Sequence, residues 1–197
     1  MWAKGEAVRP VAAFARLDHK VLDRVESRLS SDDDEADDDD LLDEAFERFE
    51  QTQPALANHV TTALSRPLDD NALGLGYFLA IALWLTFDEQ FGPRLRTVDG
   101  DALRATDESI ALEEALRAEN TRDPATVDDV IAQQQPAAAA FIHAHVEAAL
   151  DSEPGVAASV RDVDSVYRLA LVVLLSLSYA VLPDEALPVT ASCEILA

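Results

Sequence analysis

The amino-acid sequence predicts an all-α protein, a single helical bundle of about six to eight helices. Apolar residues recur at three- and four-residue steps through much of the chain, which is typical of one face of an amphipathic helix. Two uncharged apolar segments, 72–87 and 169–183, have the character of helices that are buried on every side. The alternation typical of strands is absent, apart from an ambiguous stretch at 187–196.

The first element that we expect is an N-terminal amphipathic helix within residues 1–30. Its regular part is predicted at Val8–Leu29, and Pro10 suits the first helical turn, where a missing N–H costs nothing. The acidic run Asp32–Asp40 follows. Because dense like charges repel and have nothing to bury, we expect residues 31–40 to form a disordered linker. The apolar face of the helix is formed by Phe14, Leu17, Val21, Val25 and Leu29.

The remaining residues, 41–197, are expected to form one helical bundle domain with a degenerate internal repeat. FEQTQPALANHV begins at Phe49 and IAQQQPAAAAFI begins at Ile131. Further on, GYFLAIALWL from Gly76 resembles VYRLALVVLL from Val166. Two such copies also arise by chance in a sequence rich in Ala and Leu, so a true duplication remains one of two readings.

Each copy predicts a helix, a Gln-x-Gln-Pro break, a second helix and an apolar helix. The residue before a proline is pushed out of the α region, and the proline then suits the first position of the next helix. We expect the glutamines Gln51, Gln53, Gln133 and Gln135 to satisfy backbone groups left unpaired at the breaks. The predicted parts are repeat one at about 41–91, a connecting helix at about 99–120 that is kinked near 106–109, repeat two at about 124–183, and a short C-terminal tail.

The two apolar segments are interpreted as the equivalent central helices of the bundle. A membrane-spanning helix needs about 20 apolar residues, whereas these segments offer 16 and 15. Asp70 and Asp88 bracket the first segment, and extending it would place carboxylates in hydrocarbon at about 2.5–3.5 kcal/mol each. We therefore expect no membrane span.

The charge balance is strongly acidic, with 38 Asp and Glu against 15 Lys and Arg and a net charge of −23. Lys4 and Lys20 are the only lysines. Without the eight acids of the run at Asp32–Asp40, 30 acidic residues still face the same 15 basic ones. This balance predicts a cytoplasmic protein dissolved in molar salt, and the lack of a basic patch argues against nucleic-acid binding. Whether the acidic run binds cations or a basic partner stays open.

No recognisable catalytic or metal-binding motif is present. Nucleotide-binding loops, nucleophile elbows and HExxH motifs are absent. His143 and His145 lie on different sides of a helix, and no Glu stands three residues before His19, His59 or either of them, which argues against a di-metal bundle site. Cys193 is the only cysteine, so no intramolecular disulfide can form. We expect no metal, no cofactor and no catalytic residues.

Two functional hypotheses remain. The first is a non-catalytic helical protein of a high-salt cytoplasm that acts through protein–protein contact, with a protein partner or as a homo-oligomer. The alternative is a helical enzyme or small-ligand-binding protein with a pocket between the two repeats that uses His59 or His143. A polar pocket with a histidine at the repeat boundary would favour the alternative, and a solid core with an exposed apolar patch would favour the first.

The acidic composition predicts that stability depends on salt. In dilute buffer the carboxylates repel one another and loosen the fold, whereas at about 2 M KCl the screening length falls below about 3 Å and the fold is restored. The measurement is the melting temperature by far-UV circular dichroism in both solutions. An unchanged melting temperature would contradict the high-salt interpretation.

Overall fold

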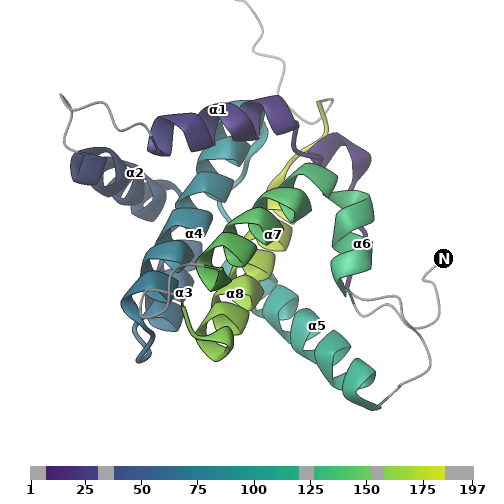
Figure 1. Cartoon of the computed structure of the whole chain (residues 1–197). Coiled ribbons are helices and arrows are strands. Elements are labelled where there is room, and N and C mark those ends of the chain that lie inside the picture. Colours follow the sequence, from purple (N-terminus) through teal and green to yellow (C-terminus); the bar gives the residue numbers. More distant parts are fainter. Residues whose placement is uncertain (1–7, 31–37, 120–126, 152–157, 185–197) are drawn as a thin grey trace, which may run out of the picture.

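The protein is an all-α bundle, as predicted (Figure 1). The structure, a computed structural model, describes residues 8–30, 38–119, 127–151 and 158–184. Within these ranges there are eight α-helices and no named strand. The elements are η1 (Ala13–Ala15), α1 (His19–Leu29), α2 (Asp38–Thr52), α3 (Pro54–Leu64), α4 (Asp70–Phe91), η2 (Gly92–Arg94), α5 (Gly100–Glu119), α6 (Val127–Gln134), α7 (Pro136–Leu150) and α8 (Val160–Ala180), where η denotes a 3₁₀ helix.

The N-termini of α4 and α8 are joined by their caps. The Asp69 carboxylate accepts hydrogen bonds from the N–H of Ala72 in its own helix (2.7 Å) and from the N–H of Ser159 (2.8 Å). In return, the Asp162 carboxylate accepts from the N–H of Asp69 (3.3 Å), while the Ser159 hydroxyl caps α8 at the N–H of Asp162 (3.2 Å). The first N–H groups of both helices need acceptors, and the residues at the two N-termini supply acceptors to each other.

The opposite ends of α4 and α8 are joined through backbone groups. The N–H of Arg96 donates to the carbonyl of Ala180 (3.1 Å), and the N–H of Leu182 donates to the carbonyl of Arg94 (2.8 Å). Because the chain just after α4 is tied to the end of α8, and the two starts are also tied, these helices run parallel and pack along their length.

Both apolar helices meet the length and composition required to cross a membrane. Core helices of soluble bundles meet the same criteria. Within the most apolar window, 61% of the residues of Asp70–Arg94 and 67% of those of Val160–Ala180 are buried inside the fold. Trp84, Phe87 and Leu174 have no exposed surface. Helices α1, α2, α3 and α7 cover α4, and α3, α5 and α7 contact α8.

The N-terminal helix is shorter than predicted. Residues 8–18 are not helical apart from the 3₁₀ turn at Ala13–Ala15, and α1 begins at His19 instead of Val8. Asp18 caps α1 by accepting from the N–H of Lys20 (2.9 Å). The apolar spacing fits a helix, but hydrogen bonds from distant side chains hold the segment before Asp18 in an extended form. The prediction for Val8–Leu29 was therefore wrong over its first half.

Three glutamine side chains hold extended segments in place by the same geometry. Each amide accepts from one backbone N–H and donates to the carbonyl two residues earlier, as a neighbouring strand would. We call this arrangement a glutamine clamp. Gln135 donates to the carbonyl of Ala15 (2.8 Å) and accepts from the N–H of Leu17 (2.9 Å). Gln90 donates to the carbonyl of Arg16 (2.8 Å) and accepts from the N–H of Asp18 (2.8 Å). Gln53 donates to the carbonyl of Arg96 (3.1 Å) and accepts from the N–H of Val98 (2.7 Å).

Gln53 and Gln135 occupy the predicted breaks before Pro54 and Pro136. Their backbones share one non-helical conformation, with φ −132° at both and ψ of 55° and 60°. Their side chains are 2% and 0% exposed. The two amides serve distant segments rather than the ends of their own helices, and the neighbouring Gln51 and Gln133 are exposed. The expected structural role therefore applies to the second glutamine of each pair, through long-range hydrogen bonds.

Two predicted boundaries need correction. Helix α2 begins at Asp38, so the helix includes the last three residues of the expected linker 31–40, since acidic residues are favourable in a first helical turn. Residues 31–37 and the expected C-terminal tail after 184 lie outside the described residues. Helix α5 continues through Thr106 and Ser109, where a break or kink was expected.

Replacing a clamp glutamine should destabilise the fold. Gln135→Leu removes the partners of two buried backbone groups, at about 1–3 kcal/mol each, so we expect a loss of about 2–6 kcal/mol. Urea unfolding in molar KCl measures this loss. Gln133→Leu, two residues earlier and exposed, should stay within about 0.5 kcal/mol of the wild type. Equal stability of the two variants would contradict the role of the clamp.

Candidate ligand-binding site

His59, one of the two histidines named from the sequence, lies on α3 in a small pocket between α3, α5 and α8. Asp107, Arg66 and Arg168 also line this pocket. Burial lowers the pKa of His59 below its usual 6.5, the nearby Asp107 carboxylate raises it, and the two arginines lower it further. The imidazole is therefore neutral at pH 7. Among the described residues it makes no hydrogen bond.

The ionic groups around His59 are occupied with one another. Arg168 pairs with the carboxylates of Asp107 (2.8 Å) and Glu114 (3.2 Å). The pocket measures about 120 Å³, whereas sites for small organic ligands usually measure about 300–1,000 Å³. This volume suits a few waters. A histidine does lie at the boundary between the two predicted repeats, but the space beside it is too small for a substrate.

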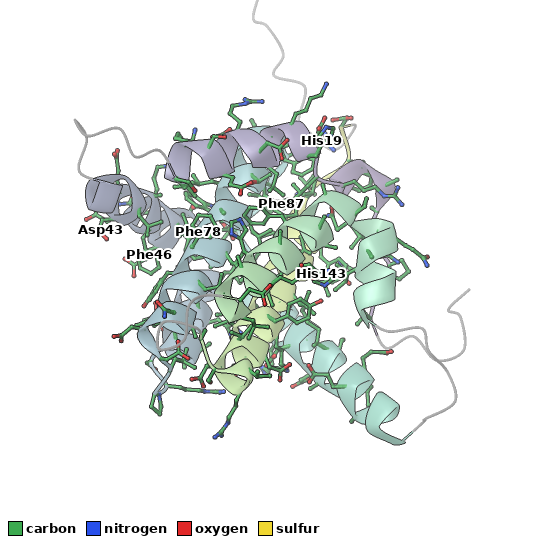
Figure 2. All side chains as sticks on the ribbon, viewed as in Figure 1. His19, Asp43, Phe46, Phe78, Phe87 and His143 are labelled. Carbon is green, nitrogen blue, oxygen red and sulfur yellow. The ribbon has the colours of Figure 1, made fainter. Side chains whose placement is uncertain are left out.

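The other three histidines lie apart from this pocket. His143 is exposed on α7, where its Nε2 lies 3.0 Å from the hydroxyl of Tyr167 and its ring stacks on that residue. Figure 2 shows His143 well separated from His19, which lies at the start of α1. His145 pairs with Glu26 (3.2 Å). Within the described part of the chain, no group of three potential ligands is placed to hold a metal ion.

A cavity larger than the His59 pocket lies between α5 and α8 and measures about 480 Å³. Its remaining walls come from the extended residues 96–99 and from Val8 and Arg9, so both chain segments next to the glutamine clamps help to form it. We call it the α5–α8 cavity. Its lining is mostly apolar, as in many small-molecule sites. The polar side chains around it include Arg9, Arg96, Asp99, Thr106, Ser176 and Tyr179.

Ser176 is the unusual polar group of the α5–α8 cavity. It is 3% exposed, and its hydroxyl has no hydrogen-bond partner in the structure. By contrast, Ser178 donates to the carbonyl of Leu174 (2.7 Å) and accepts from Gln135 (2.9 Å). Buried hydroxyls nearly always have partners, but the Ser176 oxygen has no surface that a water molecule can reach, so it is an unsatisfied group behind the cavity wall and does not mark a place for a ligand atom.

Tyr179 fixes the N-terminal edge of the cavity. Its hydroxyl donates to the carbonyl of Arg9, and the Arg9 guanidinium lies 4.0 Å from the centre of the Tyr179 ring. Burial raises the pKa of Tyr179 to about 12, against a smaller lowering by Arg9. The phenol is therefore protonated at neutral pH and acts here as a hydrogen-bond donor.

Neither His59 nor His143, the histidines named from the sequence, lines this cavity. Ser176 and Tyr179 lie inside an apolar segment that was interpreted only as a buried helix. The hydroxyl groups that interrupt LLSLSYA were the available signal, because a hydroxyl in a dry core requires a partner. Nothing in the neighbouring sequence indicates that Arg9 and Arg96 line the cavity, because their positions depend on clamps by distant glutamines.

Comparison of the chain with protein families, with curated proteins and with solved structures found no match.

The lowered pKa of His59 predicts a pH dependence. The unfolded chain binds the His59 proton more readily than the fold does, so stability falls as the pH drops through about 6.5. In the variant His59→Gln, the part of this loss of stability that is due to His59 should disappear. Urea unfolding of both proteins between pH 5 and 7.5 in molar KCl measures it. The other histidines are common to both proteins, so identical slopes would contradict the assignment.

Proposed function

We propose that the protein binds a small molecule in the α5–α8 cavity. The observation that carries the proposal is a cavity of about 480 Å³ whose lining is mostly apolar and includes a few polar side chains. This volume is within the usual range for small-ligand sites. The proposal keeps the ligand-binding alternative drawn from the sequence but moves it away from His59 and His143, which do not line this cavity.

We propose binding without catalysis at this site. A serine nucleophile needs an adjacent base to activate it. The residues described around the cavity include no histidine, lysine or glutamate. The one carboxylate, Asp99, accepts from the N–H groups of Asp101 (2.8 Å) and Ala102 (3.3 Å) at the start of α5. These partners support a capping role for Asp99.

A second candidate function is contact with another protein or with a second copy of the chain. The observation that favours it is the course of α5, whose C-terminal half extends beyond the other helices (Figure 1). Leu112 lies on this part and is 54% exposed. An apolar side chain on a projecting helix provides a contact point for a partner.

We also propose that α2–α4 and α6–α8 are two copies of one repeat, arranged around α4 and α8 as central helices. The support comes from the two breaks. Gln53 and Gln135 share a backbone conformation, precede a proline and clamp an extended segment. A shared long-range function is stronger support than the similarity in sequence alone.

For its surroundings we propose a cytoplasm of high salt, with neither a membrane span nor a nucleic-acid partner. The net charge of −23 supports this proposal, since molar salt screens the repulsion and the charge is unfavourable beside phosphates. Burial of most of the two apolar windows supports the interpretation of α4 and α8 as core helices.

The cavity proposal predicts that a bulky residue at its edge abolishes ligand binding. A screen of small molecules by thermal shift in molar KCl should give ligands that raise the melting temperature. At 100 times Kd the stabilisation is about 2.7 kcal/mol, or about 5–10 °C for a chain of this size. In Ala105→Trp, at an exposed lining position, the shift should vanish.

The matched control is Ala111→Trp, at an exposed position on the same helix that does not line the cavity. It should keep the full shift. If the ligands stabilise Ala105→Trp as strongly as they stabilise Ala111→Trp, they bind elsewhere, and the proposed function is wrong.

A further inference from the structure

The mouth of the α5–α8 cavity is basic in a strongly acidic protein. Arg9 and Arg96 line it from two different chain segments, and both residues are exposed. Neither guanidinium pairs with a carboxylate within the part of the chain that the structure describes. The arginines that do pair are Arg24, Arg28, Arg48, Arg94, Arg104 and Arg168.

The backbones of both arginines are held in place. The carbonyl of Arg96 accepts from Gln53 (3.1 Å), and its N–H donates to Ala180 (3.1 Å). The carbonyl of Arg9 accepts from Tyr179, whose ring also carries the Arg9 guanidinium. The Arg9 guanidinium is thus held at the edge of the cavity, and the backbone that carries the exposed Arg96 is held at the same edge. Asp99, the acid that shares this lining, has its carboxylate directed to the N–H groups of Asp101 and Ala102.

The interior differs from the mouth. Between the arginines and Ser176 the walls are mainly apolar and include Val98 and Leu175. Thr106 already donates to the carbonyl of Ala102 (2.9 Å), and the Ser176 oxygen has no surface open to the cavity. The cavity therefore combines a cationic mouth and an apolar body.

We infer that the ligand is a small organic acid, whose carboxylate is bound at Arg9 and Arg96 and whose apolar body lies against Val98 and Leu175. The inference rests on the proposed function of this cavity. Guanidinium groups bind carboxylates through charge-assisted hydrogen bonds. A cation would be repelled by both arginines, and a polyanion such as a nucleic acid would meet two basic groups at this mouth and many carboxylates beyond it.

The experiment compares three probes of matched shape by isothermal titration in molar KCl. They are 4-phenylbutanoate, its neutral amide 4-phenylbutanamide, and 4-(4-hydroxyphenyl)butanoate. The acid should bind about tenfold more tightly than the amide, which corresponds to one hydrogen bond to a charged group. The hydroxylated acid should bind more weakly than the unsubstituted acid, because its phenol would lie against the apolar walls.

Variants assign each preference to its residue. Arg96→Gln and Arg9→Gln should each weaken binding of the acid toward that of the amide and leave the amide unchanged. Ser176→Ala should leave all three affinities unchanged, because the hydroxyl of Ser176 has no surface open to the cavity. Arg161→Gln is the control for general charge, because Arg161 is exposed and lines none of the cavities described above. It should leave all three affinities unchanged.

The outcomes separate this inference from the proposed function. Acid and amide binding equally, with both blocked by Ala105→Trp, would overturn the inference and leave the proposed function standing. Equal losses in Arg96→Gln and Arg161→Gln would also overturn it, because the effect would then be one of bulk charge. If no probe binds, the organic-acid inference is wrong, and the screen with Ala105→Trp still decides the proposed function.

Discussion

The non-helical parts of this bundle depend on glutamine side chains that act as short pieces of strand. A glutamine amide has an NH₂ group that donates and a C=O group that accepts. These groups match the carbonyl of one residue and the N–H of the residue two positions later, which lie on the same edge of an extended chain. Gln135 and Gln90 occupy opposite edges of the segment before α1, and Gln53 holds the segment before α5. Without these amides, buried backbone groups would lack partners.

The candidate site is a consequence of these clamps. Helices α5 and α8 supply two walls of the cavity, whereas Arg9 and Arg96 come from the extended segments. Gln53 bonds directly to the carbonyl of Arg96, and Gln135 bonds to Ala15, a few residues after Arg9. The bundle therefore sets the apolar interior, and the clamped segments set the charged edge. Damage to a clamp would disturb this edge even where the core persists.

The helices could be predicted from the sequence because their signals are local. Apolar period and proline positions indicated where most of them lie. The segment 8–18 could not be predicted in this way. Its periodicity is that of a helix, but its partners lie more than 70 residues away, at Gln90 and Gln135. The α5–α8 cavity was missed for the same reason, because residues brought together by distant hydrogen bonds leave no spacing pattern to read.

Molar salt weakens some of the interactions in this fold and leaves others unchanged. The ion pairs of Arg28 with Glu89 and of Arg48 with Asp88 involve arginines about half exposed, at 46% and 54%. Such surface pairs contribute little, and molar salt screens them together with the repulsion among the acids. The glutamine clamps are neutral and mostly buried, so salt does not screen them. In the environment that the composition suggests, the apolar contacts between α4 and α8 and the neutral clamps must therefore hold the fold.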